Sequence, residues 1–260
     1  MNSLPNTRTV MSIATLIALA ACTPASDHEA DEHETPHWSY DGDTGPDHWG
    51  TMNETFSACS EGTAQSPIDI AGAEAQDGAA IMLHYQSATL NIVNNGHTVQ
   101  VNHDAASSTM APAGTFSLKQ FHFHAPSEHT VDGRSFPAEV HLVHQAEDGT
   151  LAVFGILIEE GEANEAYASV LANLPADAGE AHDVADVAID PATLLPEDLA
   201  YYGYDGSLTT PPCSEGVKWH VLANPVQLSA EQVAAYTAIY SGNNRPVQPL
   251  NERTVGAQQQ

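Results

Sequence analysis

The chain has 260 residues and carries 34 Asp and Glu against 6 Lys and Arg, a formal net charge of −28. Charged residues make up 15 % of the chain, below the roughly 25 % of average domains, so the anomaly is a shortage of bases. Such a chain cannot neutralise phosphates, which excludes nucleic acid as a partner. A hydrophobic content of 42 % excludes disorder throughout, and the length permits one large domain or two small ones.

The first residues are predicted to be an export signal. Residues 10–21 form an apolar run that is shorter than the about 20 residues needed to span a bilayer, and this length suits a signal peptide. We therefore predict a signal peptide over 1–21 and an exported protein, located in the periplasm or at the cell surface.

The end of that run, Leu19-Ala20-Ala21-Cys22, resembles the lipobox of bacterial lipoproteins. Cleavage before such a cysteine frees it for acylation, so we predict a lipid anchor at Cys22 as the protein's only membrane contact. The alternative is an ordinary secretory signal cleaved near 18–20, which leaves the protein secreted. Residues 22–36 are acidic, lack aliphatic side chains larger than alanine and are predicted to be a flexible linker.

The cysteine count is consistent with export. Once Cys22 is assigned to the signal, Cys59 and Cys213 remain as an even pair. In an oxidising compartment they can form a disulfide, and the alternative is two buried free thiols.

No second linker and no internal repeat interrupts the chain from residue 37 onward. We predict one domain over 37–256 and a C-terminal tail over 257–260. Alternating apolar and polar residues predict several strands, and Asn95-Gly96 predicts a hairpin turn between the first two. The predicted strands are 90–93, 98–102, 120–124, 139–144, 152–158 and 218–222.

Helices are fewer than strands. Residues 229–232 have the pattern of a capping box that opens a helix over 230–240, and 164–174 is a second candidate. The predicted fold class is therefore β-rich α+β.

Two of the predicted strands carry histidines in a pattern that indicates a metal site. Side chains alternate between faces, so Gln120, His122 and His124 share one face of the first strand, and Glu139 and His141 share one face of the second. If the strands pair, three imidazoles converge. Three histidine ligands with an open fourth coordination position are typical of a catalytic zinc site. Gln120 and Glu139 each precede a ligand by two residues and can accept the outer imidazole N–H groups.

A competing template is the first cupin metal motif. His122, His124 and Glu128 have its spacing, and there the glutamate is a ligand. The second cupin box requires a bracketing glycine that residues 137–141 lack, so we rank this alternative second.

A series of further motifs occurs in order along the chain, and together they resemble the α-class carbonic anhydrases of the bacterial, exported type. The resemblance runs from about His37 to Val255. The motifs are His37-Trp38-Ser39-Tyr40, Gly45-Pro46-Asp47-His48-Trp49, Gln65-Ser66-Pro67-Ile68-Asp69-Ile70, Asn94-Asn95-Gly96-His97, Phe121-His122-Phe123-His124, Ser127-Glu128-His129-Thr130, Glu139-Val140-His141-Leu142-Val143-His144, Ser207-Leu208-Thr209-Thr210-Pro211-Pro212 and Arg245-Pro246-Val247-Gln248-Pro249-Leu250-Asn251.

The resemblance implies a fold and an activity. The implied fold is a single domain with a large, twisted, mostly antiparallel β-sheet and short surface helices. The implied activity is the zinc-dependent reversible hydration of carbon dioxide to bicarbonate and a proton, by zinc-hydroxide attack on carbon dioxide held in an apolar pocket. A histidine then shuttles the proton to solvent.

The resemblance also implies a role for each matching residue. Zinc is held by His122, His124 and His141, supported by Gln120, Glu139 and the backbone carbonyl of Asn243. Thr209 accepts the proton of the hydroxide and donates its own to Glu128, while Thr210 positions substrate. The implied apolar pocket for carbon dioxide comprises Val143, Val153, Leu208, Val217 and Trp219. The implied proton shuttle is His97, with Tyr40 and Asn95 in the solvent network around it. Cys59 and Cys213 match the positions of a disulfide in exported members.

The chain departs from the family pattern after the second histidine of the first strand. Ala125-Pro126 leads directly to Ser127, where many animal members carry a longer loop, so the rim of the cleft is not predicted.

A second hypothesis is a non-enzymatic exported zinc-binding lipoprotein, similar to the family's acatalytic relatives. Such relatives typically lose a ligand histidine, and this chain retains all three.

Overall fold

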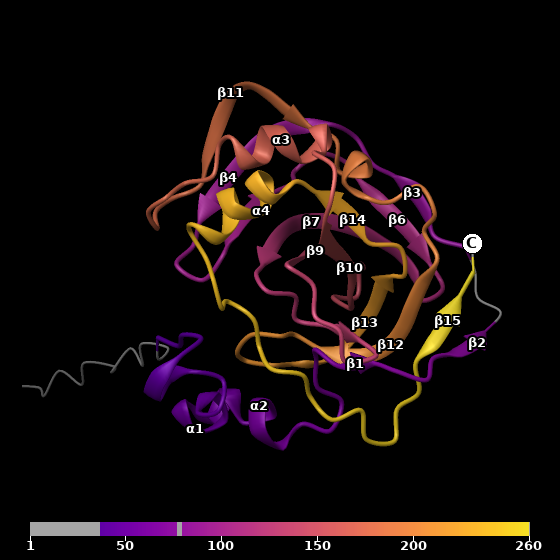
Figure 1. Cartoon of the computed structure of the whole chain (residues 1–260). Helices are drawn as coiled ribbons and strands as arrows, with labels where there is room; N and C mark the ends of the chain where they lie inside the picture. The colour runs from indigo at the N-terminus through magenta and orange to yellow at the C-terminus, as the bar shows by residue number, and fades with distance from the viewer. Residues whose placement is uncertain (1–36, 77–79, 260) are drawn as a thin grey trace, which may run out of the picture. The chain divides into compact units, whose positions relative to one another are not determined.

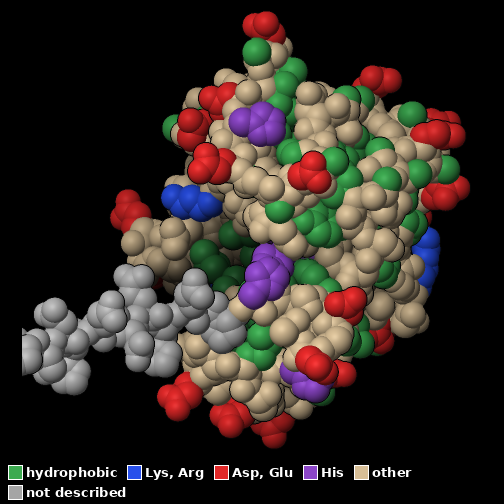
Figure 2. Space-filling model, turned by 90° about the vertical axis from the view of Figure 1, so that its left-hand side faces the viewer, with side chains coloured by type: hydrophobic (Ala, Val, Ile, Leu, Met, Phe, Trp, Pro, Cys, Tyr) green, Lys and Arg blue, Asp and Glu red, His purple; other side chains and the backbone are tan. Residues whose placement is uncertain are grey.

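The computed structural model describes residues 37–76 and 80–259, which form one compact unit. The predicted signal peptide, the lipidation site Cys22 and the acidic linker lie outside the described residues and stay predictions. Among the described residues no helix has both the length and the apolar character needed to cross a membrane. On the face that Figure 2 displays, Asp and Glu side chains are spread over the surface and few Lys or Arg accompany them.

Strands make up most of the regular structure in the described part of the chain. They are β1 (Asp69–Ile70), β2 (Glu74–Gln76), β3 (Met82–His84), β4 (Ala88–Asn94), β5 (Val99–Asn102), β6 (Ser108–Ala111), β7 (Gly114–His124), β8 (Thr130–Val131), β9 (Ala138–Gln145), β10 (Leu151–Glu160), β11 (His182–Ile189), β12 (Tyr201–Ser207), β13 (Glu215–Leu222), β14 (Val226–Leu228) and β15 (Gly256–Gln258).

One 13-stranded sheet contains all of these except β1 and β8, which pair with each other. Its main path runs β11-β4-β5-β7-β9-β10-β13-β12-β15-β2. Most neighbours are antiparallel, and the parallel pairs in this sheet are β10 with β13, β10 with β14, and β15 with β2. Figure 1 shows the twist of this sheet. The predicted β-rich α+β class, with a large and mostly antiparallel sheet, is confirmed.

The six predicted strands correspond to β4, β5, β7, β9, β10 and β13, and the hairpin turn lies at Asn95-Gly96, where Gly96 adopts a φ of 90°. The predicted C-terminal tail is wrong for residues 257 and 258, which continue β15. Gly-Ala-Gln has no β-branched or aromatic residue, so only backbone pairing with β12 and β2 makes this segment a strand.

The helices are short. The predicted pair are α3 (Glu165–Leu171) and α4 (Ala230–Thr237), and both are shorter than predicted. In α4 the capping box is present, because Ser229 and Gln232 bond reciprocally. Figure 1 shows α3 and α4 close together at one side of the sheet. The remaining helices are α1 (Trp49–Met52), α2 (Ala58–Glu61), and the 3₁₀ turns η1 (Gly42–Thr44), η2 (Glu54–Phe56) and η3 (Pro191–Leu194).

Strand β7 separates the main hydrophobic core from the histidine face. Phe121 and Phe123 are 0 % and 2 % exposed and pack in the largest hydrophobic cluster with Tyr167 of α3 and Tyr236 of α4. The alternation of side chains then directs Gln120, His122 and His124 to the opposite face. The helices therefore fix the orientation of β7 by covering its apolar side.

A disulfide joins Cys59 of α2 to Cys213, which follows β12. The predicted pairing is confirmed, and the bond links residues 154 positions apart in the chain. The N–H of Cys213 donates to the carbonyl of Thr210 at 2.8 Å, so the disulfide anchors the loop that carries Thr209 and Thr210.

Two buried histidines away from the metal-binding pattern predict an acid-sensitive fold. Burial lowers the pKa of His144 to about 3 and that of His220 to about 4. Between these values and the unfolded pKa of about 6.5, the unfolded chain binds protons that the folded chain does not. Stability is therefore expected to fall as pH drops below about 6.5, by up to about 1.4 kcal/mol per pH unit for each histidine.

The variant His220→Phe is expected to show a shallower fall, because its side chain cannot titrate. His220 already packs near Phe154 and Tyr201, with ring centroids 5.4 and 4.9 Å away, so an aromatic replacement suits the site. Urea unfolding of both proteins between pH 7 and pH 4.5 measures the difference. An identical slope in the variant would show that His220 does not contribute.

Candidate metal centre

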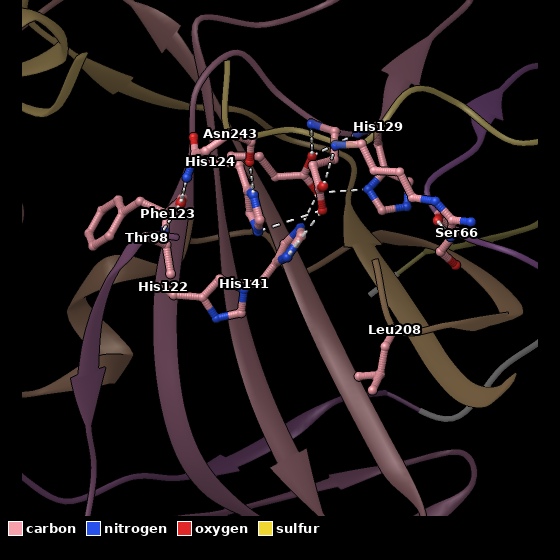
Figure 3. Close-up of polar contacts among 12 residues, drawn as sticks. Ser66, Thr98, His122, Phe123, His124, His129, His141, Leu208 and Asn243 are labelled. Carbon is pink, nitrogen blue, oxygen red and sulfur yellow. Dashed lines mark hydrogen bonds and ion pairs between the residues drawn. The ribbon is translucent and has the colours of Figure 1, made fainter. Parts of the chain in front are cut away.

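The pairing of β7 with β9 brings three histidines together. His122 lies directly opposite His141 in the register, and His124 follows two residues along β7. Their ring centroids are 4.6 to 5.2 Å apart, and one nitrogen from each ring lies within 4.8 Å of the others. Figure 3 shows the three imidazoles directed toward a common point.

Each ring also bonds an acceptor on its outer side. Nδ1–H of His124 donates to the backbone carbonyl of Asn243 at 2.6 Å. Nε2–H of His141 donates to Glu139 Oε1 at 2.9 Å, and Nδ1–H of His122 donates to Gln120 Oε1 at 2.8 Å. In a neutral imidazole the other nitrogen then carries a lone pair, so all three inner nitrogens can ligate a cation.

Burial keeps these imidazoles neutral. It lowers the pKa of His124 to about 4, and it also lowers the pKa of His122 and His141, with the neighbouring imidazoles opposing further positive charge. Neutral histidine is the form that binds metal. The inner Nε2 of His124 is buried and has no hydrogen-bond partner among the described residues, and a bound cation would satisfy it.

Glu139 organises the outer side of the cluster and is itself fully buried. Its Oε1 also accepts from Nδ1 of His129 at 2.7 Å, and its Oε2 accepts from the N–H groups of Glu128 and His129 at 2.9 and 2.8 Å. Burial raises the pKa of this carboxyl, but His129 and His141 outweigh burial and hold it well below its usual range. His129, Glu139 and His141 also lie within ligand distance of one another, but their facing atoms are already paired by hydrogen bonds.

The space for this carboxylate depends on a glycine in β10. A Cβ added to Gly155 would lie 2.8 Å from Glu139 Oε1, closer than a carbon and an oxygen can approach without displacement. The variant Gly155→Ala is therefore expected to shift Glu139 and to weaken metal binding about 10- to 100-fold, the usual effect of disturbing such a partner. Competition with a chelator of known affinity measures this, and Gly179→Ala, which has open space around its Cβ, is the matched control. Equal affinities in both variants would contradict the prediction.

Glu128 lies at the inner edge of the cluster, with Oε2 3.6 Å from Nε2 of His124 and 3.8 Å from Nδ1 of His141. Burial raises its pKa to about 7, while His141, the N–H of Arg245 and the hydroxyl of Thr209 act in the opposite direction. The N–H of Arg245 donates to Glu128 Oε1 at 2.8 Å. The metal-ligand group that the described residues form around His122 contains no carboxylate.

The residues predicted for the apolar pocket gather in one hydrophobic cluster. Val153, Val217 and Trp219 are each 2 % exposed, and Val143 and Leu208 pack against them half-buried. Val143, Val153 and Trp219 are consecutive cross-strand partners on β9, β10 and β13. The ring of Trp219 lies 4.9 Å from that of His141, so this cluster adjoins the metal ligands.

His97 follows the turn after β4 and stacks on Trp38, with ring centroids 3.7 Å apart. Burial lowers its pKa, and His37 lowers it further. The side-chain oxygen of Asn95 accepts from the N–H groups of His97 and Thr98, both at 3.0 Å, so it stabilises the turn that holds the imidazole. Tyr40 packs edge-on to Trp38, and burial raises its pKa well above 10.

The buried side chain of Asn243 connects the ligand strand to its surroundings. Its Oδ1 accepts from the N–H of Ala125 at 2.9 Å, and its Nδ2 lies 3.1 Å from the carbonyl of His97 and 3.0 Å from that of Phe123. One residue therefore holds the imidazole of His124 through its backbone and the turn of His97 through its side chain.

Sequence reasoning missed two supporting residues. Gly155 stands within an apolar strand pattern, which is a known signal of close approach, yet its partner is remote in sequence. Arg245 is 1 % exposed, and its guanidinium donates to oxygens of Gln65, Ser66 and Cys59, each at 2.8 Å. Nothing in the local sequence indicates that this arginine is buried.

Comparison with known proteins agrees with this architecture. Residues 44–259 match the family model of the eukaryotic-type carbonic anhydrases. The carbonic anhydrase of Pectobacterium carotovorum is 43 % identical over 247 residues, covering 94 % of this chain and 98 % of the relative. That of Neisseria gonorrhoeae is 42 % identical, covering 93 % and 95 %.

A solved structure of the α-carbonic anhydrase from Thermovibrio ammonificans, in complex with the inhibitor sulfanilamide, superposes with a TM-score of 0.82 at 43 % identity. The alignment covers 85 % of this chain and 99 % of that one. The chain therefore belongs to the eukaryotic-type carbonic anhydrase family. Its activity is that of a carbonic anhydrase, the hydration of carbon dioxide. The cupin alternative is wrong.

Proposed function

We propose that this protein hydrates carbon dioxide at a zinc ion held by His122, His124 and His141. The observation that carries the proposal is the convergence of three neutral imidazoles whose outer nitrogens are all bonded to acceptors, with the buried Nε2 of His124 unpartnered among the described residues. Zinc bound to three protein nitrogens lowers the pKa of a coordinated water to about 7 and so supplies the nucleophile.

The orientation of that nucleophile is assigned to Thr209 and Glu128. An ionised Glu128 only accepts hydrogen bonds, so a Thr209 hydroxyl that bonds it must donate, and its oxygen is left to accept from the attacking water. The backbone N–H of Arg245 holds the same carboxylate at 2.8 Å. Thr209 thereby favours a nucleophile that carries a proton to donate, and this hydrogen bond orients a lone pair of the nucleophile toward the substrate.

Substrate and proton are handled on different sides of the cluster. Carbon dioxide is apolar, so the surface of Val143, Val153, Leu208, Val217 and Trp219 can hold it beside the ligands without strong binding. Thr210 is assigned to position the substrate. His97 is assigned to carry the released proton to buffer, since its imidazole is partly exposed at the turn after β4 and a histidine can both accept and release a proton. Tyr40 and Asn95 support it by packing and by fixing its turn.

The test is a stopped-flow assay of carbon dioxide hydration with and without a zinc chelator. The proposal expects rapid hydration that the chelator abolishes and that added zinc restores. Hydration that survives complete metal removal, or a zinc-loaded protein without activity, would overturn it, and the second outcome would favour the non-enzymatic zinc-binding hypothesis.

We also propose that the chain is exported and anchored through a lipid at Cys22, with residues 22–36 as a flexible linker to the domain over 37–256. The Cys59–Cys213 disulfide supports the export. Mass spectrometry of the mature N-terminus tests the anchor, because a diacylated or triacylated cysteine differs in mass from an unmodified secreted end.

A further inference from the structure

A row of polar side chains crosses the sheet next to the metal ligands. Gln120 of β7, Asn102 of β5, Asn91 of β4 and Asp183 of β11 are successive cross-strand partners. Partners in register share a face of the sheet, so this row lies on the face that carries His122. The same row continues on the other side of Gln120 as the apolar residues of the proposed pocket.

Hydrogen bonds connect three members of this row, Asn102, Asn91 and Asp183, with Gln100 of β5 into a chain that begins beside the metal ligands. Gln100 Nε2 donates to Asn102 Oδ1 at 2.6 Å, Asn102 Nδ2 donates to Asn91 Oδ1 at 2.8 Å, and Asn91 Nδ2 donates to Asp183 Oδ1 at 2.7 Å. Gln100 is the cross-strand partner of His122. The chain therefore runs from a metal ligand's neighbour to an exposed carboxylate.

The direction of this chain follows from its last member. A carboxylate can only accept, so Asn91 must present its N–H₂ group to Asp183 and its oxygen to Asn102. Asn102 must then donate to Asn91 and offer its own oxygen to Gln100. Gln100 in turn donates to Asn102, and its Oε1 is left with no partner among the described residues, on the sheet face that it shares with His122.

We propose that Asp183 is a positioning residue that fixes the orientation of the Gln100 amide, with its oxygen free beside the metal centre. This oxygen can only accept hydrogen bonds, so the site holds bicarbonate weakly. The inference rests on the proposed function, because it assumes that the three histidines hold the reacting metal. A free amide oxygen repels the oxygens of an anion and can accept a hydrogen bond from water. Both effects assist release of the charged product. A free N–H₂ group in the same place would bind that anion.

The variant Asp183→Lys tests this directly, because an ammonium can only donate. It must bond Asn91 Oδ1, which reverses every donor in the chain and leaves Gln100 Nε2 free. The KM for bicarbonate in the dehydration reaction and the Kd of thiocyanate by calorimetry are each expected to fall about fivefold, about 1 kcal/mol. The kcat is expected to change less than the KM.

Two controls separate the hydrogen-bond chain from simple charge. Asp104 lines the same cavity of about 280 Å³ as Asn91, Asn102 and Asp183 but belongs to no bond of the chain, so Asp104→Lys makes the same charge change without reversing any donor. Gln100→Leu removes the proposed end point, and Asp183→Lys is expected to have no effect on thiocyanate binding in that background. Zinc content and melting temperature are measured for every variant.

Tighter anion binding in Asp183→Lys that requires Gln100 and is absent in Asp104→Lys supports the inference. Equal tightening in Asp104→Lys, persistence in the Gln100→Leu background, or no tightening at all overturns it. If the wild-type protein binds zinc and is active, and Asp183→Lys binds anions as the wild type does, only this inference is contradicted. If the wild-type protein lacks zinc or hydration activity, the proposed function is contradicted.

Discussion

Replacement of His124 by alanine is expected to remove bound zinc and carbon dioxide hydration together. The loss follows because Nε2 of His124 is one of three converging nitrogens, and no carboxylate lies in the ligand group that the described residues form around it. We expect zinc affinity to fall at least about a hundredfold, more than for loss of an outer partner, and hydration to fall in proportion to bound metal. Zinc content by atomic emission and stopped-flow hydration measure the two effects.

The matched control for this variant is His84→Ala, which removes an exposed histidine of β3. It is expected to keep wild-type zinc content and rate. If His124→Ala also retains wild-type zinc and hydration, the histidine cluster is not the metal centre. If it keeps zinc but loses activity, His124 acts in another way than as a ligand.

Replacement of Thr209 by valine is expected to keep zinc while hydration slows about a hundredfold, the usual effect of removing one oriented hydrogen-bonding group from a reaction site. Valine has nearly the same shape as threonine but cannot relay a hydrogen bond to Glu128. Thr209 is 6 % exposed and does not belong to the group of His122, His124 and His141 that can hold the metal, so the metal should stay bound. Single-turnover rates at equal zinc occupancy measure the change.

The companion variant Glu128→Gln is expected to slow hydration as well, because an amide can donate to Thr209 and so allow its hydroxyl to turn. An unchanged rate in Thr209→Val would refute the assigned orientation of the nucleophile. A loss of zinc in that variant would instead show that Thr209 supports the ligands.

The central part of the fold could be predicted because its local patterns agree with its long-range pairing. Alternation in 120–124 and 139–144 indicated strands, and the histidines on one face of each would converge if these strands were neighbours. The structure places them as direct partners. The capping box at Ser229 and the Asn95-Gly96 turn were predicted for the same reason, since their signals lie within a few residues.

The peripheral strands could not be predicted, because their residues carry no such pattern. Strand β11 has mostly exposed side chains, and its register with β4 shifts between Asp183 and Ala188. Strands β2 and β15 contain Glu, Gln, Gly and Ala, and only backbone pairing, of β15 with β12 and of β2 with β15, makes them part of the sheet. Their pairing joins residues 74–76 to residues 256–258, which are far apart in the sequence, and short-range reasoning does not address such contacts.

The candidate site divides in the same way. Its ligands and their adjacent partners Gln120 and Glu139 follow from spacing along two strands. Its remote supports join residues far apart in the chain: the carbonyl of Asn243 lies 119 positions from His124, and the N–H of Arg245 lies 117 positions from Glu128. Family resemblance indicated Asn243, whereas the burial of Arg245 and the space above Gly155 emerge only from the three-dimensional packing.

The most direct test of the metal centre is anomalous X-ray diffraction from crystals of the purified protein at the zinc absorption edge. One strong peak is predicted within bonding distance, about 2.0–2.1 Å, of Nε2 of His122, Nε2 of His124 and Nδ1 of His141. A peak among His129, Glu139 and His141 instead, or no zinc peak in crystals of active protein, would contradict the assignment.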